Sequence, residues 1–452
     1  MKRKTPQLID EAAYRLPGGS IVYESIVVDP CCRIFAYALM AVHGWFVFGA
    51  DGMPNAMRGP YDEVLSETPV MSASGRVACG AREGAQWFAI VDGKAGWRHD
   101  GLGARSFSFG PLGQRFSYTA YDGGKWKLLI DRAPVLSVDA TMAGTFTFSP
   151  DERRWAIMAR DGGRSACFVD GKPVGDYDPG SADAPMFSPN SERIAFGGRR
   201  GGAWVLNVDG TESRGFDSVG GFTFRPDSTG CAYAAEEHGR WFVVIDGQET
   251  EGFDDVARSS PQYSMSGKSL VYGARDGRRW LVLRNGAVVT QASALGTRTP
   301  RFVPGGEKVA VIEVHGEGMR LSIDGTAVSA THKGIANLVF SRDGKRMAYA
   351  AAAAGSSWVQ IVDGVRSATY EKIGTTVFSA DGQHYAYRAW KHGQPRIVID
   401  GVEYWKGRRP WAAAPLAWDG STLRTFLTDG NQVIRVAATH AGAAPPASTA
   451  EV

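Results

Sequence analysis

WFVVIDGQETEGFDDV, at residues 241–256, runs from an apolar segment into an Asp-Gly pair and then resumes with Phe253. Aromatic and β-branched residues between turn signals are typical of strands. Asp-Gly is a strong tight-turn dipeptide because glycine accepts positive φ at no steric cost. Similar segments recur at residues 87–96 (WFAIVDGKAG) and 358–373 (WVQIVDGVRSATYEKI). The phrase therefore predicts a strand, a turn and a further strand, repeated along the chain.

The aspartate of this phrase marks a repeat of about 39 residues, with successive spacings between 37 and 41. Two aromatic columns keep the same period: one precedes a turn of the Ser-Pro-Asp-Gly type, and the other follows a small residue. Each unit predicts four short strands, which we call A to D from first to last. The marker positions are Asp51, Asp92, Asp131, Asp170, Asp209, Asp246, Asn285, Asp324, Asp363 and Asp400.

Many four-stranded units of this length predict an all-β fold, a β-propeller of about eleven blades. One large closed ring is favoured because the period has no break, and two tandem rings are the alternative. Residues 26–438 hold the blades, and the tail at 439–452 is expected to be disordered. The last unit stops after strand C, so residues 1–25 are expected to supply a closing strand. Only residues 5–16 could instead form a short helix.

The repeated pattern FSPDG-x-R-x-AY-x-A, followed by G-x-W-x-V-x-V-DG, resembles the WD40-like (PD40, TolB-type) propeller repeats of bacteria. The resemblance covers about residues 20–438. It implies the propeller fold and leaves function open, since such blades occur in periplasmic scaffolds such as TolB and beside peptidase domains. This sequence shows neither a secretory signal pattern nor a peptidase domain.

The composition limits the classes of binding partner and the cellular compartment that we expect for this protein. The net charge of +3 on 452 residues is too small to argue for nucleic acid or an acidic membrane. The five cysteines are odd in number and lack C-x-x-C spacing, which favours buried thiols in a reducing compartment. We expect a cytoplasmic monomer without a membrane segment.

The sequence contains no recognisable catalytic or metal-binding motif. MSASG (71–75) and SMSGKS (264–269) fall at expected A–B turns, and the eight histidines have no metal-ligand spacing. We therefore expect no catalytic residue, no metal and no cofactor. The repeated Asp, Trp and Tyr residues are expected to be structural.

The B–C turns carry more basic than acidic residues, and B–C turns should share one rim of the ring. This predicts a non-enzymatic interaction scaffold whose rim binds a partner protein, with an acidic segment as the complementary surface. The alternatives are a hydrolase or lyase with a site in the central channel, and a sensor of a small ligand or glycan. The residues assigned to partner binding are Arg160, Arg164, Arg199, Arg200, Arg240, Arg278, Arg279 and Lys391.

Overall fold

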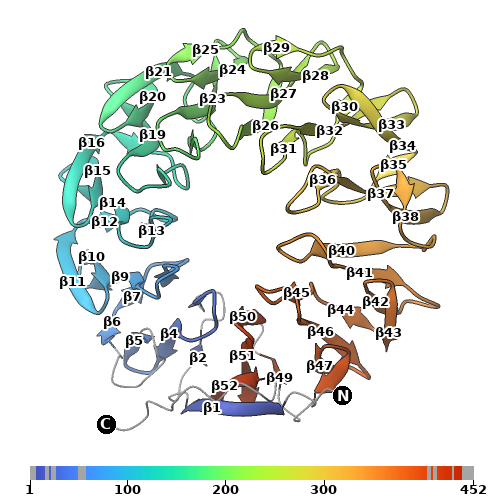
Figure 1. The fold of residues 1–452 in the computed structure, drawn as a ribbon. Coiled ribbons are helices and arrows are strands. Elements are labelled where there is room, and N and C mark those ends of the chain that lie inside the picture. Colours follow the sequence, from blue (N-terminus) through green and yellow to red (C-terminus); the bar gives the residue numbers. More distant parts are fainter. Residues whose placement is uncertain are drawn as a thin grey trace.

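The chain forms one ring of eleven blades around a central opening (Figure 1). The computed structural model describes residues 7–15, 20–21, 27–48, 58–404, 409–410, 415–429 and 432–439. Every regular element in these residues is a strand, and their sheets are antiparallel. The predicted propeller with about eleven blades in a single ring is confirmed, and the alternative of two rings is wrong.

Each blade runs from strand A at the central opening to strand D at the outer edge. The A strands, most of them in two short parts, are β2 (Ser20–Ile21), β3 (Val27–Val28), β7 (Glu63–Val64), β8 (Val70–Met71), β12 (Gly101–Leu102), β13 (Ser108–Phe109), β17 (Ala140–Thr141), β18 (Thr147–Phe148), β22 (Met186–Phe187), β26 (Ser218–Phe224), β30 (Asp255–Val256), β31 (Gln262–Tyr263), β35 (Ala294–Leu295), β36 (Arg301–Phe302), β40 (Ile335–Phe340), β44 (Lys372–Ile373), β45 (Val377–Phe378), β49 (Arg409–Pro410) and β50 (Ala417–Asp419).

The three outer positions are filled in chain order in every blade except the last, where β1 takes the outermost position. The B strands are β4 (Phe35–Ala41), β9 (Val77–Glu83), β14 (Phe116–Asp122), β19 (Trp155–Asp161), β23 (Ile194–Arg200), β27 (Cys231–Glu237), β32 (Leu270–Asp276), β37 (Val309–His315), β41 (Met347–Ala352), β46 (Tyr385–Lys391) and β51 (Thr422–Asp429). The C strands are β5 (Gly44–Phe48), β10 (Gln86–Val91), β15 (Lys125–Ile130), β20 (Arg164–Val169), β24 (Ala203–Val208), β28 (Arg240–Ile245), β33 (Arg279–Arg284), β38 (Gly318–Ile323), β42 (Trp358–Val362), β47 (Gln394–Ile399) and β52 (Gln432–Thr439). The D strands are β6 (Arg58–Tyr61), β11 (Lys94–His99), β16 (Ala133–Val138), β21 (Lys172–Tyr177), β25 (Thr211–Glu212), β29 (Gln248–Glu249), β34 (Ala287–Ala292), β39 (Thr326–Ala327), β43 (Val365–Tyr370), β48 (Val402–Tyr404) and β1 (Gln7–Arg15).

One part of the predicted strand pattern is wrong. The segments GFDDV (252–256) and TYEKI (369–373) were each expected to form a single strand D. In the structure each segment divides between two blades: Tyr370 ends β43, whereas Lys372 and Ile373 pair with β46 of the next blade. The change of blade takes about one residue, so the junction has no turn signal of the kind that marks the other strand ends.

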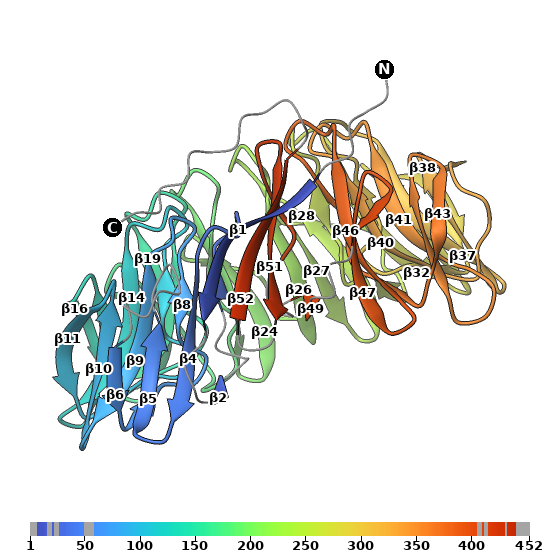
Figure 2. The same cartoon turned by 90° about the horizontal axis from the view of Figure 1, so that it is seen from below.

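The last blade is completed by the first strand of the chain. β1 pairs with β52 antiparallel along its length, from Gln7 opposite Thr439 to Arg15 opposite Gln432. Figures 1 and 2 both show β1 at the outer edge of β52. For the described residues 7–15 the alternative of a helix is therefore wrong, because the edge of β52 offers backbone partners along this segment.

The core of the ring lies between neighbouring blades. The B strands bury up to five consecutive residues because a blade is covered on both faces. Tyr118, Tyr272 and Tyr387 are 1–2% exposed, in agreement with the expected structural role of the tyrosine column. Tryptophans of the C strands, such as Trp204 and Trp280, are only half-buried, at the end of the strand next to the B–C turn.

Candidate partner-binding rim

The B–C turns and the D–A junctions lie on the same rim of the ring, which we call the upper rim. An acidic side chain at the junction accepts a hydrogen bond from the backbone N–H of the following B–C turn, at 2.6–3.1 Å. These bonds hold the turns in place. The acceptor and donor pairs are Asp62 and Gly84, Asp100 and Gly123, Asp139 and Gly162, Asp178 and Gly201, Asp217 and His238, Asp254 and Gly277, and Glu371 and Gly393.

The sequence interpretation missed this acidic column, although it keeps the period of the repeat. The contacts of one member, Asp139, lower the pKa of its carboxyl. At Asp139 the hydrogen bond from Lys125 Nζ, at 2.6 Å, lowers the pKa of the carboxyl most, followed by the bond from the Gly162 N–H. Asp139 therefore stays ionised and neutralises part of the basic charge of the rim.

The structure brings together most of the predicted partner-binding residues on one arc of the upper rim. Seven of the eight lie on the hairpins of four successive blades, β19–β20, β23–β24, β27–β28 and β32–β33. Lys391 lies three blades further on, at the β46–β47 hairpin. The predicted set is therefore one arc and one separate residue.

Several of these cations already have acidic partners within the chain. Arg200 Nη1 lies 2.6 Å from Glu212, and Arg240 Nη1 lies 2.6 Å from Asp254. Lys391 Nζ lies 3.9 Å from Glu403, a long contact. An ion pair within the molecule reduces the charge available to a partner, so Arg200 and Arg240 are weaker candidates than their exposure suggests.

The remaining five arginines of the set form no ion pair within the described residues. Arg164 donates to the Gly175 carbonyl at 2.7 Å, and Arg279 donates to the Gln291 side chain at 3.2 Å. Arg199 lies over the Trp204 ring at 5.4 Å. Arg160 and Arg278 are exposed. These five side chains keep their full charge at the solvent-exposed surface.

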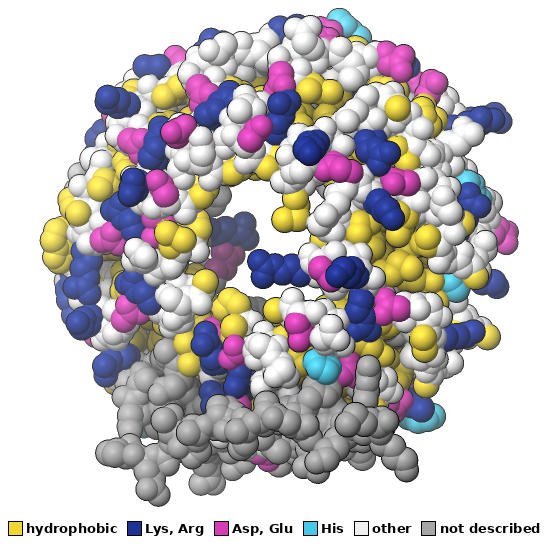
Figure 3. Space-filling view, in the orientation of Figure 1, with side chains coloured by type: hydrophobic (Ala, Val, Ile, Leu, Met, Phe, Trp, Pro, Cys, Tyr) yellow, Lys and Arg dark blue, Asp and Glu magenta, His cyan; other side chains and the backbone are white. Residues whose placement is uncertain are grey.

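Figure 3 draws the ring face formed by the A–B turns and the Asp-Gly turns, which is opposite the upper rim. Lys and Arg side chains alternate there with Asp and Glu around the central opening. This opposite face therefore carries no uniformly basic field.

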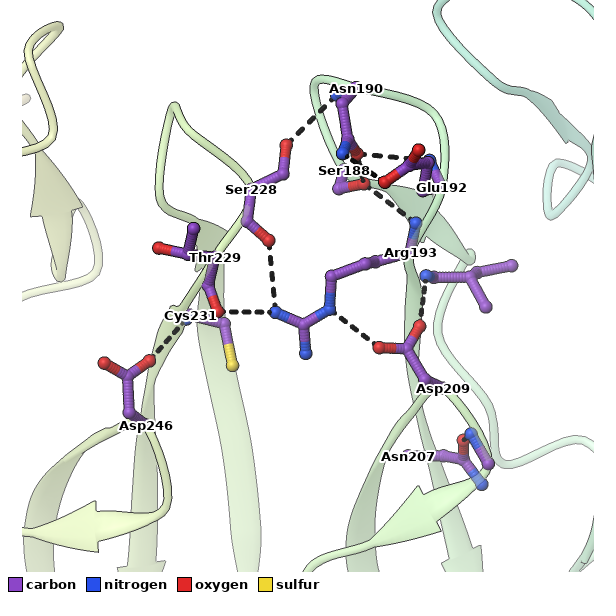
Figure 4. Close-up of polar contacts among 12 residues, drawn as sticks. Ser188, Asn190, Glu192, Arg193, Asn207, Asp209, Ser228, Thr229, Cys231 and Asp246 are labelled. Carbon is purple, nitrogen blue, oxygen red and sulfur yellow. Dashed lines mark hydrogen bonds and ion pairs between the residues drawn. The ribbon is translucent and has the colours of Figure 1, made fainter.

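The opposite rim, formed by A–B turns and Asp-Gly turns, is held by a repeated contact between blades (Figure 4). Arg193 Nε donates to Asp209 at 2.7 Å, and its Nη1 donates to the carbonyls of Ser228 and Thr229 in the next blade at 3.2 and 3.0 Å. The guanidinium also lies 5.5 Å from the centre of the Phe224 ring. The arrangement recurs at Arg76, Arg115, Arg154 and Arg346.

This contact explains the marker column of the sequence. Asp209 has a φ of 54° at the turn, and its Oδ1 accepts the backbone N–H of Ile194 at 2.8 Å. The repeated aspartates thus join two turns of one blade and hold the arginine that reaches the next blade. The matching arginine column, sixteen or seventeen residues earlier, was present in the sequence but was not recognised.

A buried carboxylate, Glu313 on β37, is the strongest candidate for reactive chemistry, but its oxygens are fully engaged. Oε1 accepts hydrogen bonds from Ser322 and Thr290 at 2.5 and 2.6 Å, and Oε2 accepts one from Arg320 at 2.7 Å. Burial favours the neutral acid, yet these hydrogen bonds outweigh it and lower the pKa of Glu313. The group is therefore an ionised structural acceptor.

A second polar cluster lies between two neighbouring blades. His99 is 4% exposed, and its Nδ1 lies 2.8 Å from Asp122, while its Nε2 lies 3.3 Å from the Tyr118 hydroxyl. Burial raises the pKa of Tyr118 to about 12. Since Tyr118 is 1% exposed, no substrate reaches its hydroxyl in this conformation.

The described ranges contain no group of three or more His, Cys, Asp or Glu side chains placed to hold a metal ion. They also contain no helix of the length and apolar character needed to cross a bilayer. The five cysteines are free thiols, four of them buried, and burial raises the pKa of Cys79 to about 12.

Comparison with known proteins gives a distant likeness in structure alone. No family model matches the chain, and no curated protein has a significant match. One similar solved structure is a eukaryotic initiation factor, with 11% identity, a TM-score of 0.41, and coverage of 87% of this chain and 89% of that chain. Another is TolB from Acinetobacter baumannii, with 14% identity, a TM-score of 0.27, and coverage of 58% and 77%. A third is an oligogalacturonate lyase in complex with manganese, with 14% identity, a TM-score of 0.31, and coverage of 57% and 88%. Sequence identities and TM-scores this low support no conclusion about what this chain binds.

Proposed function

We propose that this chain is a non-enzymatic interaction scaffold that binds an acidic segment of a partner protein on its upper rim. The observation that supports the proposal is an arc of exposed arginines that form no ion pair with any residue the structure describes, chiefly Arg160, Arg199, Arg278 and Arg279. Most other basic side chains of this rim face a carboxylate of their own chain, as Arg214 does with Glu237 and Glu249. Exposed cations without internal partners attract acidic surfaces and select among partners.

The frame beneath the arc suits this role because it fixes the hairpins before binding. Junction carboxylates hold seven of the B–C turns, including those of all four hairpins of the arc, and the arginine contacts of the opposite rim join neighbouring blades. A surface that is already ordered loses little conformational entropy when a partner docks. Binding should therefore depend on charge and shape at the rim.

The test is a comparison of two charge-reversal variants in affinity capture from the native host, with the captured proteins identified by mass spectrometry. The rim variant carries Arg199→Glu, Arg278→Glu and Arg279→Glu. The control carries Arg153→Glu, Arg342→Glu and Lys345→Glu, an equal charge change at exposed positions of the opposite rim. We expect a partner that the wild type and the control capture, that added salt releases, and that the rim variant fails to capture. Equal capture by all three proteins would contradict the proposal.

A further inference from the structure

A groove of about 520 Å³ lies between the blades of β32 and β37, on the right of Figure 1. One wall carries Arg258, Ser259 and Trp280, and the other carries Leu295, Thr297 and Arg298. The volume is in the range of pockets that hold small organic ligands, about 300–1,000 Å³, and admits a few amino-acid side chains. Trp280 directly follows Arg278 and Arg279 in the sequence, so one wall of the groove belongs to the β32–β33 hairpin that carries part of the basic arc.

The groove is basic without an internal counter-charge. Arg258 and Arg298 are exposed, none of the lining residues is acidic, and neither arginine forms an ion pair within the described ranges. The groove between the blades of β24 and β28 differs, because its lining arginine, Arg193, faces Asp209. The two arginines of the basic groove come from different blades and so stand on opposite walls.

A further arginine near this groove, Arg301 on β36, reaches toward the next blade, where its guanidinium lies 5.1 Å from the centre of the Phe340 ring. The Nε of Arg301 is buried without a hydrogen-bond partner, and only Nη2 donates, to the Leu338 carbonyl at 2.7 Å. Burial lowers the pKa of Arg301, and the positive charge of Arg298 lowers it further. An occupant of the groove would meet Arg258 and Arg298, and neither has a carboxylate partner among the described residues, so these two exposed guanidinium groups favour a negatively charged occupant.

We propose that this groove binds an acidic peptide segment, with carboxylates on Arg258 and Arg298 and an apolar side chain against Trp280 and Leu295. This inference rests on the proposed function and places its binding site. The two arginines lie on opposite walls, with an apolar surface beside them. This arrangement fits an extended peptide in which an apolar residue has an acidic residue on each side. A single phosphate ion would instead require donors that converge on one point.

The probe is a fluorescein-labelled Glu-Glu-Phe-Glu-Glu peptide, whose binding to the full-length chain is followed by fluorescence anisotropy. The groove variant carries Arg258→Glu and Arg298→Glu. Glutamate is compatible with the positive φ of 58° at Arg298, because Glu67 occupies the equivalent position of another blade with a φ of 62°. The control carries Arg153→Glu and Arg342→Glu on the opposite rim. We expect the groove variant to bind on the order of tenfold more weakly and the control to bind as the wild type does.

The other results each overturn the inference. Equal weakening by the groove variant and the control would show a general charge effect. Full binding by the groove variant, with loss in the Arg199, Arg278 and Arg279 variant, would exclude the groove and leave the rim proposal standing. No binding to the wild type would also exclude the groove, while the capture experiment would still decide the proposed function. Displacement of the peptide by millimolar inorganic phosphate, with no preference for Phe over Ala in the probe, would indicate a simple anion site.

Discussion

Glu11 on β1 accepts hydrogen bonds from Arg424 Nε at 3.1 and 3.2 Å, across 413 residues of chain. Both side chains are about nine-tenths buried in the blade that closes the ring. Arg424 also contacts Asp419 at 2.6 Å. The ends of the chain are therefore joined by a buried ionic contact as well as by the β1–β52 ladder.

Replacing Glu11 by Ala should lower the free energy of unfolding by about 2–3 kcal/mol, since Arg424 loses a partner while remaining buried. Urea or thermal unfolding measures the change. Glu63→Ala is the control, because Glu63 pairs with Arg82 at the exposed surface and should cost less than about 1 kcal/mol. Equal losses would show that the Glu11 contact adds nothing to ring closure.

Arg193→Lys should weaken the join between two blades. Lysine has its three donors on one nitrogen, which cannot occupy the separate positions of Nε and Nη1 that bond Asp209 and the carbonyls of the next blade, so we expect a loss of about 1–2 kcal/mol in urea unfolding. Arg153→Lys, at a position 86% exposed on the same rim, should leave stability unchanged. A loss no larger at Arg193 than at Arg153 would argue against the contact between blades.

Glu313 should make stability depend on pH in the acid range. Its pKa is lowered in the folded state, so its contribution is fully present above the ordinary value of about 4.3 and is lost as pH falls through the lowered folded value. Glu313→Gln should therefore be about 1–3 kcal/mol less stable than wild type near neutrality, with a gap that narrows below about pH 4. Denaturant melts from pH 3 to pH 7 measure this gap, and the exposed Glu317→Gln is the control. A gap independent of pH would contradict the ionised state of Glu313.

Gly198→Ala should be destabilising by about 1–3 kcal/mol, because its Cβ would lie 2.8 Å from the Tyr177 ring in the core between two blades. Gly220→Ala, with no atom within 4 Å of the added Cβ, is the matched control and should be neutral or stabilising. Thermal melts of the two variants compare them directly. Equal melting temperatures would show that the Tyr177 ring can move aside at little cost.

The period, the strand order and the ring could be predicted because each depends on local turn chemistry repeated many times. The first strand could not be settled, because Leu8, Glu11 and Ala12 are good helix formers and only the distant edge of β52 selects the extended form. The division of residues 369–373 between two blades was missed because Tyr370 and Lys372 are separated by a single residue.

The sequence predicted which basic residues make up the candidate site, but not which of them form ion pairs with carboxylates of the same chain. Arg200 meets Glu212, whereas Arg278 meets no carboxylate among the residues that the structure describes. This difference depends on register and on neighbouring strands, which the period does not specify. Arg258 and Arg298 were missed because they lie in the break of strand A rather than in a B–C turn. Only the packing of two blades brings them to one groove.

The pairing of β1 with β52 has a consequence for biosynthesis. At ribosomal speeds of about 5–20 residues per second, the 413 residues between Glu11 and Arg424 delay their meeting by roughly 20–80 s. During that interval β1 has left the ribosomal exit tunnel before its partner strand β52 is made, and the nascent chain exposes an unpaired strand edge. A chaperone that covers β1 would act during this interval. Translation that stalls before β52 is made would leave a ring that cannot close.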